Sequence, residues 1–187
     1  MRSITRVVRL GSGFALAVAA ACAVAQSVDA TRVQTLSGWV QGSVTADGAA
    51  LRWLGVPYAA PPVGALRWRA PQPAAAWSTT LPADHFGSPC TQIGGPYGPP
   101  PAGKNWGVDN LGTFGKPVGS EDCLTLNLWR PSGTETRLPV LVFIHGGSNI
   151  VGWSGDPIYD GAHLAAAAHA LVVTVNYRLG LMGWFTH

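Results

Sequence analysis

Two apolar runs dominate the second half of the chain. Val140 to Ile144 and Leu171 to Val175 carry no charged residue, which is typical of strands buried on both faces of a parallel sheet. The Ala-rich segment 161–170 between them has a high helix propensity. Strand, helix and strand in this order predict a βαβ unit with parallel strands and a right-handed crossover. We expect Leu171 to Val175 to form an apolar sheet edge, which would make the isolated chain poorly soluble.

The first half of the chain has a different pattern. Residues 33–56 alternate and break at glycines, with turn signals at 37–38 and 47–48, which predicts a small antiparallel meander. Segment 57–77 is rich in Pro and Trp and has no clean period, so we expect an ordered, packed loop. Residues 124–129 alternate again and predict a strand. The fold class is therefore α/β: a small antiparallel N-terminal meander, then the first strands and crossover helix of a mixed, mostly parallel sheet.

Residues 1–25 have the features of a secretory signal. Basic residues precede an apolar stretch at 14–23, and small residues at 23 and 25 predict cleavage after Ala25. The basic residues are Arg2, Arg6 and Arg9. The apolar stretch is shorter than the roughly 20 residues that span a bilayer, so we expect no stable membrane anchor. Cys22 leaves open a lipoprotein cleavage before it, although Ala19 is a poor match to that signal. Residues 26–187 would then be exported, secreted or periplasmic.

The charge of the chain argues against nucleic-acid binding. The sequence has 12 Lys and Arg against 9 Asp and Glu, but three of the basic residues lie in the expected signal. The remaining charges balance, and no basic run is left to contact phosphates. Hydrophobic residues make up 47% of the chain and charged residues only 11%, which indicates a folded core.

Export also changes the interpretation of the cysteines. Without Cys22, Cys90 and Cys123 form an even pair in an oxidising compartment. Two cysteines without a neighbouring histidine are too few for a zinc site. We therefore predict a disulfide, which would contribute roughly 4 kcal/mol through loop closure.

The sequence His145-Gly146-Gly147-Ser148 follows the first apolar run. Ligands of open α/β sheets bind at the carboxyl ends of strands, and two glycines let the backbone turn sharply there. Free N–H groups at such a turn can stabilise a developing oxyanion. The alternative is that the glycines only form a turn after the strand and have no catalytic role. A dinucleotide site does not fit, because the glycine spacing is wrong and the second run ends at Asn176 rather than at an acidic residue.

Several motifs along the chain resemble, in order, those of the type-B carboxylesterase and cholinesterase-like family of the α/β-hydrolase fold. The resemblance covers the chain from about Val33 to its end. The matching motifs are Leu54-Gly55-Val56-Pro57-Tyr58-Ala59-x-Pro61-Pro62-Val63-Gly64-x-Leu66-Arg67-Trp68, Cys90-Thr91-Gln92, Ser120-Glu121-Asp122-Cys123-Leu124-x-Leu126-Asn127-x-Trp129-x-Pro131, His145-Gly146-Gly147 and Val175-Asn176-Tyr177-Arg178-Leu179-Gly180.

The resemblance implies roles for particular residues. Cys90 and Cys123 match the first disulfide of the family, and Arg67 and Glu121 match a structural ion pair that would matter only if buried. Backbone N–H groups at the positions of Gly147 and Ser148 form two of three oxyanion-hole donors in the family, and Gly146 shapes the turn. His145 would be a buried strand-end residue and not the general base.

Two departures from the family pattern concern the substrate pocket. The family has Gly or Ala followed by an aromatic residue where this chain has Ser148 and Asn149, which alters one wall of the acyl pocket. Trp106 lies inside the predicted disulfide loop, but its spacing to Cys123 does not match the tryptophan that binds choline in cholinesterases. We therefore expect Trp106 to cover core.

The residues of a serine-esterase triad are missing. No G-x-S-x-G elbow occurs in the sequence. The closest segment is Gly152-Trp153-Ser154-Gly155-Asp156, which fails at its last position and follows the wrong strand, so Ser154 is not expected to be a nucleophile. We therefore interpret the chain as an incomplete N-terminal part of a serine carboxylesterase that acts on small esters. Such an enzyme needs no cofactor or metal, and the chain alone is expected to be inactive. The alternatives are a non-catalytic binding or adhesion protein of the same fold and an inactive gene fragment.

Overall fold

The computed structural model describes residues 29–96, 99–100 and 108–185. The predicted signal segment and Trp106 lie outside these residues. The strands are β1 (Arg32–Gln34), β2 (Trp39–Gln41), β3 (Ser43–Val44), β4 (Ala50–Pro57), β5 (Leu81–Pro82), β6 (Gln92–Ile93), β7 (Pro117–Val118), β8 (Thr125–Pro131), β9 (Val140–Ile144) and β10 (Leu171–Val175). The helices are α1 (Ala162–Ala168) and α2 (Gly180–Trp184), with 3-10 turns η1 (Gly64–Leu66), η2 (Val108–Thr113) and η3 (Pro157–Tyr159).

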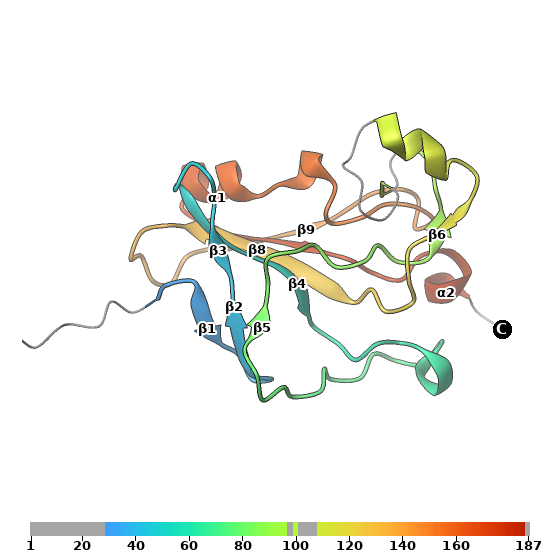
Figure 1. The fold of residues 1–187 in the computed structure, drawn as a ribbon, viewed down its shortest axis with the longest axis horizontal. Coiled ribbons are helices and arrows are strands. Elements are labelled where there is room, and N and C mark those ends of the chain that lie inside the picture. The colour runs from blue at the N-terminus through green and yellow to red at the C-terminus, as the bar shows by residue number, and fades with distance from the viewer. Residues whose placement is uncertain (1–28, 97–98, 101–107, 186–187) are drawn as a thin grey trace, which may run out of the picture.

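A five-stranded mixed sheet in the order β3-β4-β8-β10-β9 forms the centre of the fold (Figure 1). β4 pairs antiparallel with β8, and β8 pairs antiparallel with β10. β10 pairs in parallel with β9, with Leu171 opposite Val140 and Val175 opposite Ile144. The predicted parallel strands and the helix between them are therefore confirmed, and the parallel part of the sheet, within the described residues, is this β9/β10 pair.

The prediction that Leu171–Val175 forms the sheet edge is wrong. β10 lies between β8 and β9, so the edge strand is β9. The prediction of burial on both faces holds for β10, where Val172, Val173 and Thr174 are at most 7% exposed. It fails for β9, whose side chains are all exposed; among the described residues, Tyr159 of η3 contacts Phe143 of this strand, with ring centroids 4.7 Å apart.

The N-terminal strands divide between two sheets. The predicted hairpins are present, since β1 pairs antiparallel with β2 and β3 pairs antiparallel with β4. They do not form one meander, however, because β1 and β2 belong to a separate three-stranded sheet with β5. A cluster of buried side chains joins the two sheets: Val40, Leu51, Trp53, Val56 and Ala83. Burial of apolar residues from both sheets explains why the chain leaves one sheet at β2 and enters the other at β3.

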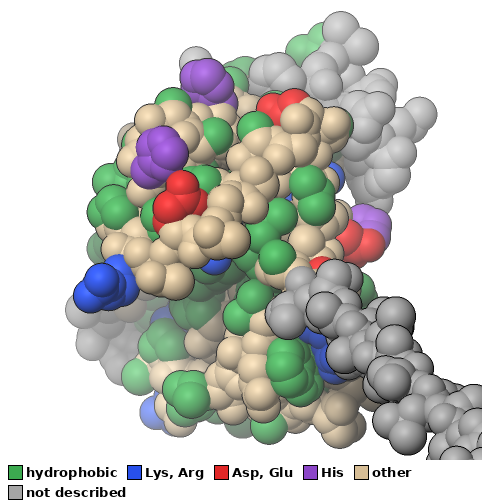
Figure 2. All heavy atoms as spheres, turned by 90° about the vertical axis from the view of Figure 1, so that its left-hand side faces the viewer, with side chains coloured by type: hydrophobic (Ala, Val, Ile, Leu, Met, Phe, Trp, Pro, Cys, Tyr) green, Lys and Arg blue, Asp and Glu red, His purple; other side chains and the backbone are tan. Residues whose placement is uncertain are grey.

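An open groove remains beside this cluster. Its lining is mainly apolar and includes Val33, Val40, Val56, Leu128 and Leu171. Figure 2 shows hydrophobic side chains in a hollow on this face of the molecule.

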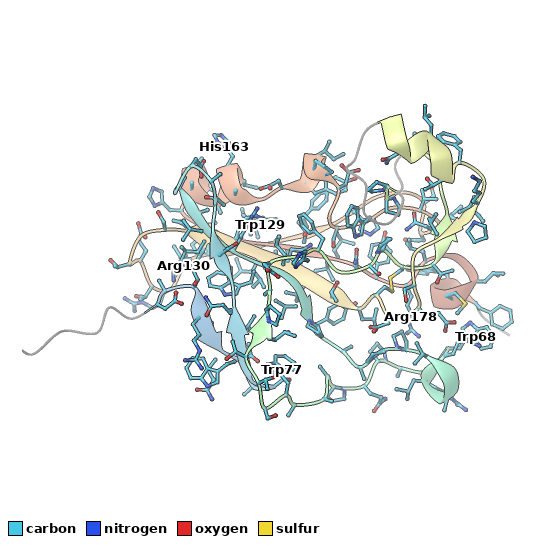
Figure 3. The ribbon with its side chains drawn as sticks, viewed as in Figure 1. Trp68, Trp77, Trp129, Arg130, His163 and Arg178 are labelled. Carbon is cyan, nitrogen blue, oxygen red and sulfur yellow. A yellow bond between two sulfur atoms is a disulfide. The ribbon has the colours of Figure 1, made fainter. Side chains whose placement is uncertain are left out.

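The face of the large sheet opposite the small sheet is covered by α1 (Figure 1). Trp129 of β8 is fully buried there and packs with Leu54, Ala165 and Val172; Figure 3 shows its ring near the middle of the molecule. The small alanine side chains of α1 allow the helix to lie close to the sheet. This packing fixes β10 and therefore the strand ends at which the glycine turn begins.

A disulfide between Cys90 and Cys123 crosslinks the remaining part of the fold. The segment it encloses contains the short antiparallel pair of β6 and β7. Both cysteines are buried with Ala59, Leu124 and Leu179. The covalent link therefore connects the β6 region to the start of β8 within a small apolar cluster.

Candidate functional site

The glycine turn starts where β9 ends, next to the carboxyl end of β10. His145, the first residue after β9, is 3% exposed. Its ring stacks on Tyr177, with ring centroids 4.6 Å apart, and the Tyr177 hydroxyl donates a hydrogen bond of 2.7 Å to the His145 carbonyl oxygen. Burial raises the pKa of Tyr177, so this hydroxyl remains a donor. Tyr177 thus fixes the first residue of the turn.

His145 is a structural residue of the turn. Its Nδ1 lies 2.9 Å from the Gly146 carbonyl oxygen; since a carbonyl can only accept, Nδ1 carries the proton. Burial lowers the pKa of His145, so the ring is neutral. A neutral ring that is stacked and hydrogen-bonded within the turn is poorly placed to act as a general base for a substrate.

The turn itself has an unusual backbone. Gly147 has φ +116°, and a Cβ at this position would clash with the Val151 carbonyl oxygen. Ser148 and Asn149 have φ +56° and +59°, a left-handed conformation that non-glycine residues seldom adopt. Ile150 and Val151 both donate their N–H groups to the Gly147 carbonyl oxygen, at 3.0 and 3.1 Å. The turn therefore closes tightly on Gly147.

Two backbone donors of the turn have no partner among the described residues. The N–H groups of Gly147 and Ser148 donate to no residue that the structure describes. Ser148 is exposed and Gly147 partly so. Adjacent free donors at an exposed turn are the groups that an oxyanion hole requires.

An open depression lies beside these donors. It is lined by Ser148, Asn149, Ile150, Gly180, Leu181 and Trp184. The N–H group of Gly180 donates to the Asn149 carbonyl oxygen at 2.7 Å, so the start of α2 is tied to the turn. The depression places apolar side chains of α2 beside the free N–H groups.

Ser154 occupies a buried structural position. Its side chain is 2% exposed. Its Oγ accepts a hydrogen bond of 3.0 Å from Asn127 Nδ2, and its N–H group donates to Asn176 Oδ1 at 2.9 Å. Asn127 also donates to Thr174 Oγ1 and accepts from the Gly55 N–H group. This polar network across β4, β8 and β10 was not foreseen from the sequence, where Asn127 and Asn176 stand out only as motif residues.

Arg67 and Glu121 form a two-pronged ion pair. Nε and one terminal nitrogen of Arg67 each lie 2.6 Å from a carboxylate oxygen of Glu121. These hydrogen bonds lower the pKa of Glu121. The side chains are 41% and 24% exposed, so the pair contributes little to stability. Figure 3 places the neighbouring Trp68 and Arg178 at the same end of the molecule, beside α2.

The described residues contain neither a metal-binding cluster nor a membrane-spanning helix. No group of three or more His, Cys, Asp or Glu side chains there has a metal-binding arrangement. Among the helices in ranges 29–96, 99–100 and 108–185, none is long and apolar enough to cross a membrane.

Comparisons with known proteins identify strong similarities. A model described as "Carboxylesterase family" matches residues 29–187. The chain is 40% identical over 152 residues to the para-nitrobenzyl esterase of Bacillus subtilis, covering 81% of this chain and 28% of that protein. It is 43% identical over 130 residues to the phenmedipham hydrolase of Pseudarthrobacter oxydans, covering 70% and 24%. The chain thus spans less than a third of the length of these relatives.

Solved structures give the same result. A structure titled PNB esterase has a TM-score of 0.68 and 38% identity, covering 84% of this chain and 30% of that one. A carboxylesterase of Geobacillus stearothermophilus has a TM-score of 0.65 and 33% identity, covering 82% and 28%. The mixed sheet described above is therefore part of an α/β-hydrolase fold.

Proposed function

Because this chain belongs to the carboxylesterase family, we propose that it forms the oxyanion-hole part of a serine hydrolase that acts on small carboxylic esters. The observation that carries the proposal is that the N–H groups of Gly147 and Ser148, at the carboxyl end of β9, donate to no residue in the described part of the chain. Their position beside an apolar depression suits an ester whose carbonyl oxygen points into the turn.

The chemistry in this proposal is acyl transfer through a serine. The serine Oγ forms a bond to the ester carbonyl carbon, and its proton passes to a histidine held by an acid. The carbonyl oxygen becomes negative, and the N–H groups of Gly147 and Ser148 stabilise it together with one further donor after the nucleophile. The alcohol then leaves with the proton, and water releases the acid from the acyl-enzyme.

The serine, the acid and the histidine of this reaction are proposed to lie outside the 187 residues. The sequence contains no G-x-S-x-G elbow, and the hydroxyl of Ser154 is buried within the fold. We therefore expect the isolated chain to hydrolyse esters no faster than buffer with a control protein.

Export of the protein is also part of the proposal. The disulfide supports it, since disulfides persist in oxidising compartments, and so do the basic and apolar segments before Ala25. N-terminal sequencing of the mature protein is expected to begin at Gln26; a retained Met1 would contradict export.

A chimera tests the proposed function. Residues 29–187 replace the matching segment of the Bacillus subtilis para-nitrobenzyl esterase, which supplies the parts of an esterase that this chain lacks. Hydrolysis of p-nitrophenyl acetate is followed for the chimera and for the isolated chain. We expect a folded, active chimera and an inactive isolated chain. A chimera that unfolds cooperatively but hydrolyses no ester would contradict the proposal.

A further inference from the structure

Gln92 makes contacts that link the disulfide region to the glycine turn. It lies in β6, two residues after Cys90, and is 6% exposed. Its Oε1 accepts a hydrogen bond of 2.9 Å from the Gly152 N–H group. Its Nε2 donates to the carbonyl oxygens of Gly152 and Cys90, at 2.8 and 3.0 Å. The carboxamide therefore binds both backbone groups of Gly152, as a neighbouring strand would.

Gly152 lies at the end of the turn and packs against the residues at its beginning. It is buried, with φ +128°, and a Cβ there would clash with the His145 ring and lie 2.7 Å from the Gly146 carbonyl oxygen. Its backbone thus packs directly against the two residues before Gly147. Any shift of Gly152 changes the space available to His145 and Gly146, and so the direction of the next N–H groups.

The segment that carries Gln92 is crosslinked and hydrogen-bonded. β6 pairs with β7, and the Cys90–Cys123 disulfide closes the same segment. The Thr91 N–H group donates to the Ser120 carbonyl oxygen at 3.1 Å, and the Ser120 N–H group donates to that of Pro89 at 2.9 Å. A crosslinked and hydrogen-bonded base holds the carboxamide in place.

We propose that Gln92 is a positioning residue for the oxyanion turn: its carboxamide holds Gly152 against His145 and Gly146 and so fixes the direction of the Gly147 and Ser148 N–H groups. The inference rests on the function proposed above. Without the carboxamide, the N–H and C=O groups of Gly152 are left buried without their partner. The turn relaxes to satisfy them, and donors displaced by a fraction of an ångström stabilise the oxyanion less.

The test compares two glutamines in the chimera. Gln92→Met removes the carboxamide and keeps the length of the side chain. Gln41→Met is the matched control, since Gln41 is partly buried and hydrogen-bonded to Thr31 in the small sheet. We expect Gln92→Met to lower kcat roughly 10- to 100-fold while KM changes by less than about twofold, and Gln41→Met to change neither. A general loss of packing would instead affect both variants.

Hydrogen exchange gives a readout that needs no activity. In the 187-residue chain at low micromolar concentration, peptides covering residues 145–152 are expected to exchange faster in Gln92→Met than in Gln41→Met. Equal exchange in the two variants overturns the inference, even if the unsubstituted chimera is inactive and the proposed function fails. An active chimera whose kcat survives Gln92→Met overturns the inference alone.

A second variant covers the case in which Gln92→Met does not fold. Gln92→Glu keeps an acceptor for the Gly152 N–H group but donates to the Gly152 carbonyl oxygen only when protonated. The kcat of this variant, relative to the unsubstituted chimera at the same pH, is expected to rise as the pH falls. A ratio that stays constant with pH overturns the inference.

Discussion

At the scale of single residues, the glycine turn has a costly backbone conformation. Gly147, Ser148 and Asn149 follow one another with positive φ, and each non-glycine residue in this region costs roughly 1 kcal/mol or more. Contacts from elsewhere hold the conformation: the Gly180 N–H group binds the Asn149 carbonyl oxygen, and Tyr177 binds that of His145. The surrounding fold, rather than local preference, therefore maintains the turn that carries the two N–H groups.

Substitution of Ser154 distinguishes a structural role of this residue from a role as nucleophile. Ser154→Ala removes the acceptor of the Asn127 hydrogen bond in a buried network, so the free energy of unfolding should fall by about 1–2 kcal/mol. Because Asn127 still binds Thr174, the fold is expected to persist. Urea unfolding of the chimera measures the loss, and its kcat should stay within about twofold of the unsubstituted value. Abolished activity at unchanged stability would identify Ser154 as a nucleophile instead.

At the scale of the elements, β9 is an exposed apolar edge. Its five side chains are between 42% and 67% exposed, and one edge of its backbone has no strand beside it among the described residues. Such an edge pairs readily with another copy of itself. The site turn follows directly from this strand, so the least protected element of the sheet carries the proposed donors.

A charge on β9 tests this property. Val142→Lys places an ammonium group on the exposed strand, where it should prevent edge-to-edge pairing. The control is Val44→Lys on β3, the short strand at the other edge of the same sheet, where Val44 is 50% exposed. In sedimentation velocity, the unsubstituted isolated chain and Val44→Lys are expected to self-associate, and Val142→Lys to shift towards monomer. A monomeric unsubstituted chain would refute the expectation.

The sequence was sufficient to predict the longer strands and the helix between the two apolar runs, but not the short strands β5–β7, the helix α2 or the neighbours of each strand. Both apolar runs became strands with the predicted bounds, and segment 161–170 became α1, because runs and propensity are local properties. Which run lies at the edge depends on β8, some 40 residues earlier than β10, and no local pattern encodes that pairing. The position of the turn could be predicted; the role of Gln92 could not, since Gly152 is 60 residues away.

At the scale of the whole molecule, the described part of the chain builds a scaffold around one proposed catalytic feature. The five-stranded sheet supplies β9, and Tyr177, the start of α2 and the disulfide-linked β6 segment contact the turn that follows it. The chain spans 28% of the para-nitrobenzyl esterase, and its own sequence has no nucleophile elbow. The proposed ester hydrolysis therefore requires that this scaffold be joined to a serine, an acid and a histidine.

The most direct test of the proposed oxyanion hole is the effect of Gly147→Ala on kcat in the chimera. The added methyl group would clash with the Val151 carbonyl oxygen and turn the donors away. Gly48→Ala is the control, because Gly48 also has a positive φ, +72°, but has open space around it. Gly147→Ala is expected to lower kcat roughly 100-fold or more with KM nearly unchanged, while Gly48→Ala retains the kcat of the unsubstituted chimera. Two folded variants with equal kcat would contradict the assignment of the turn as an oxyanion hole.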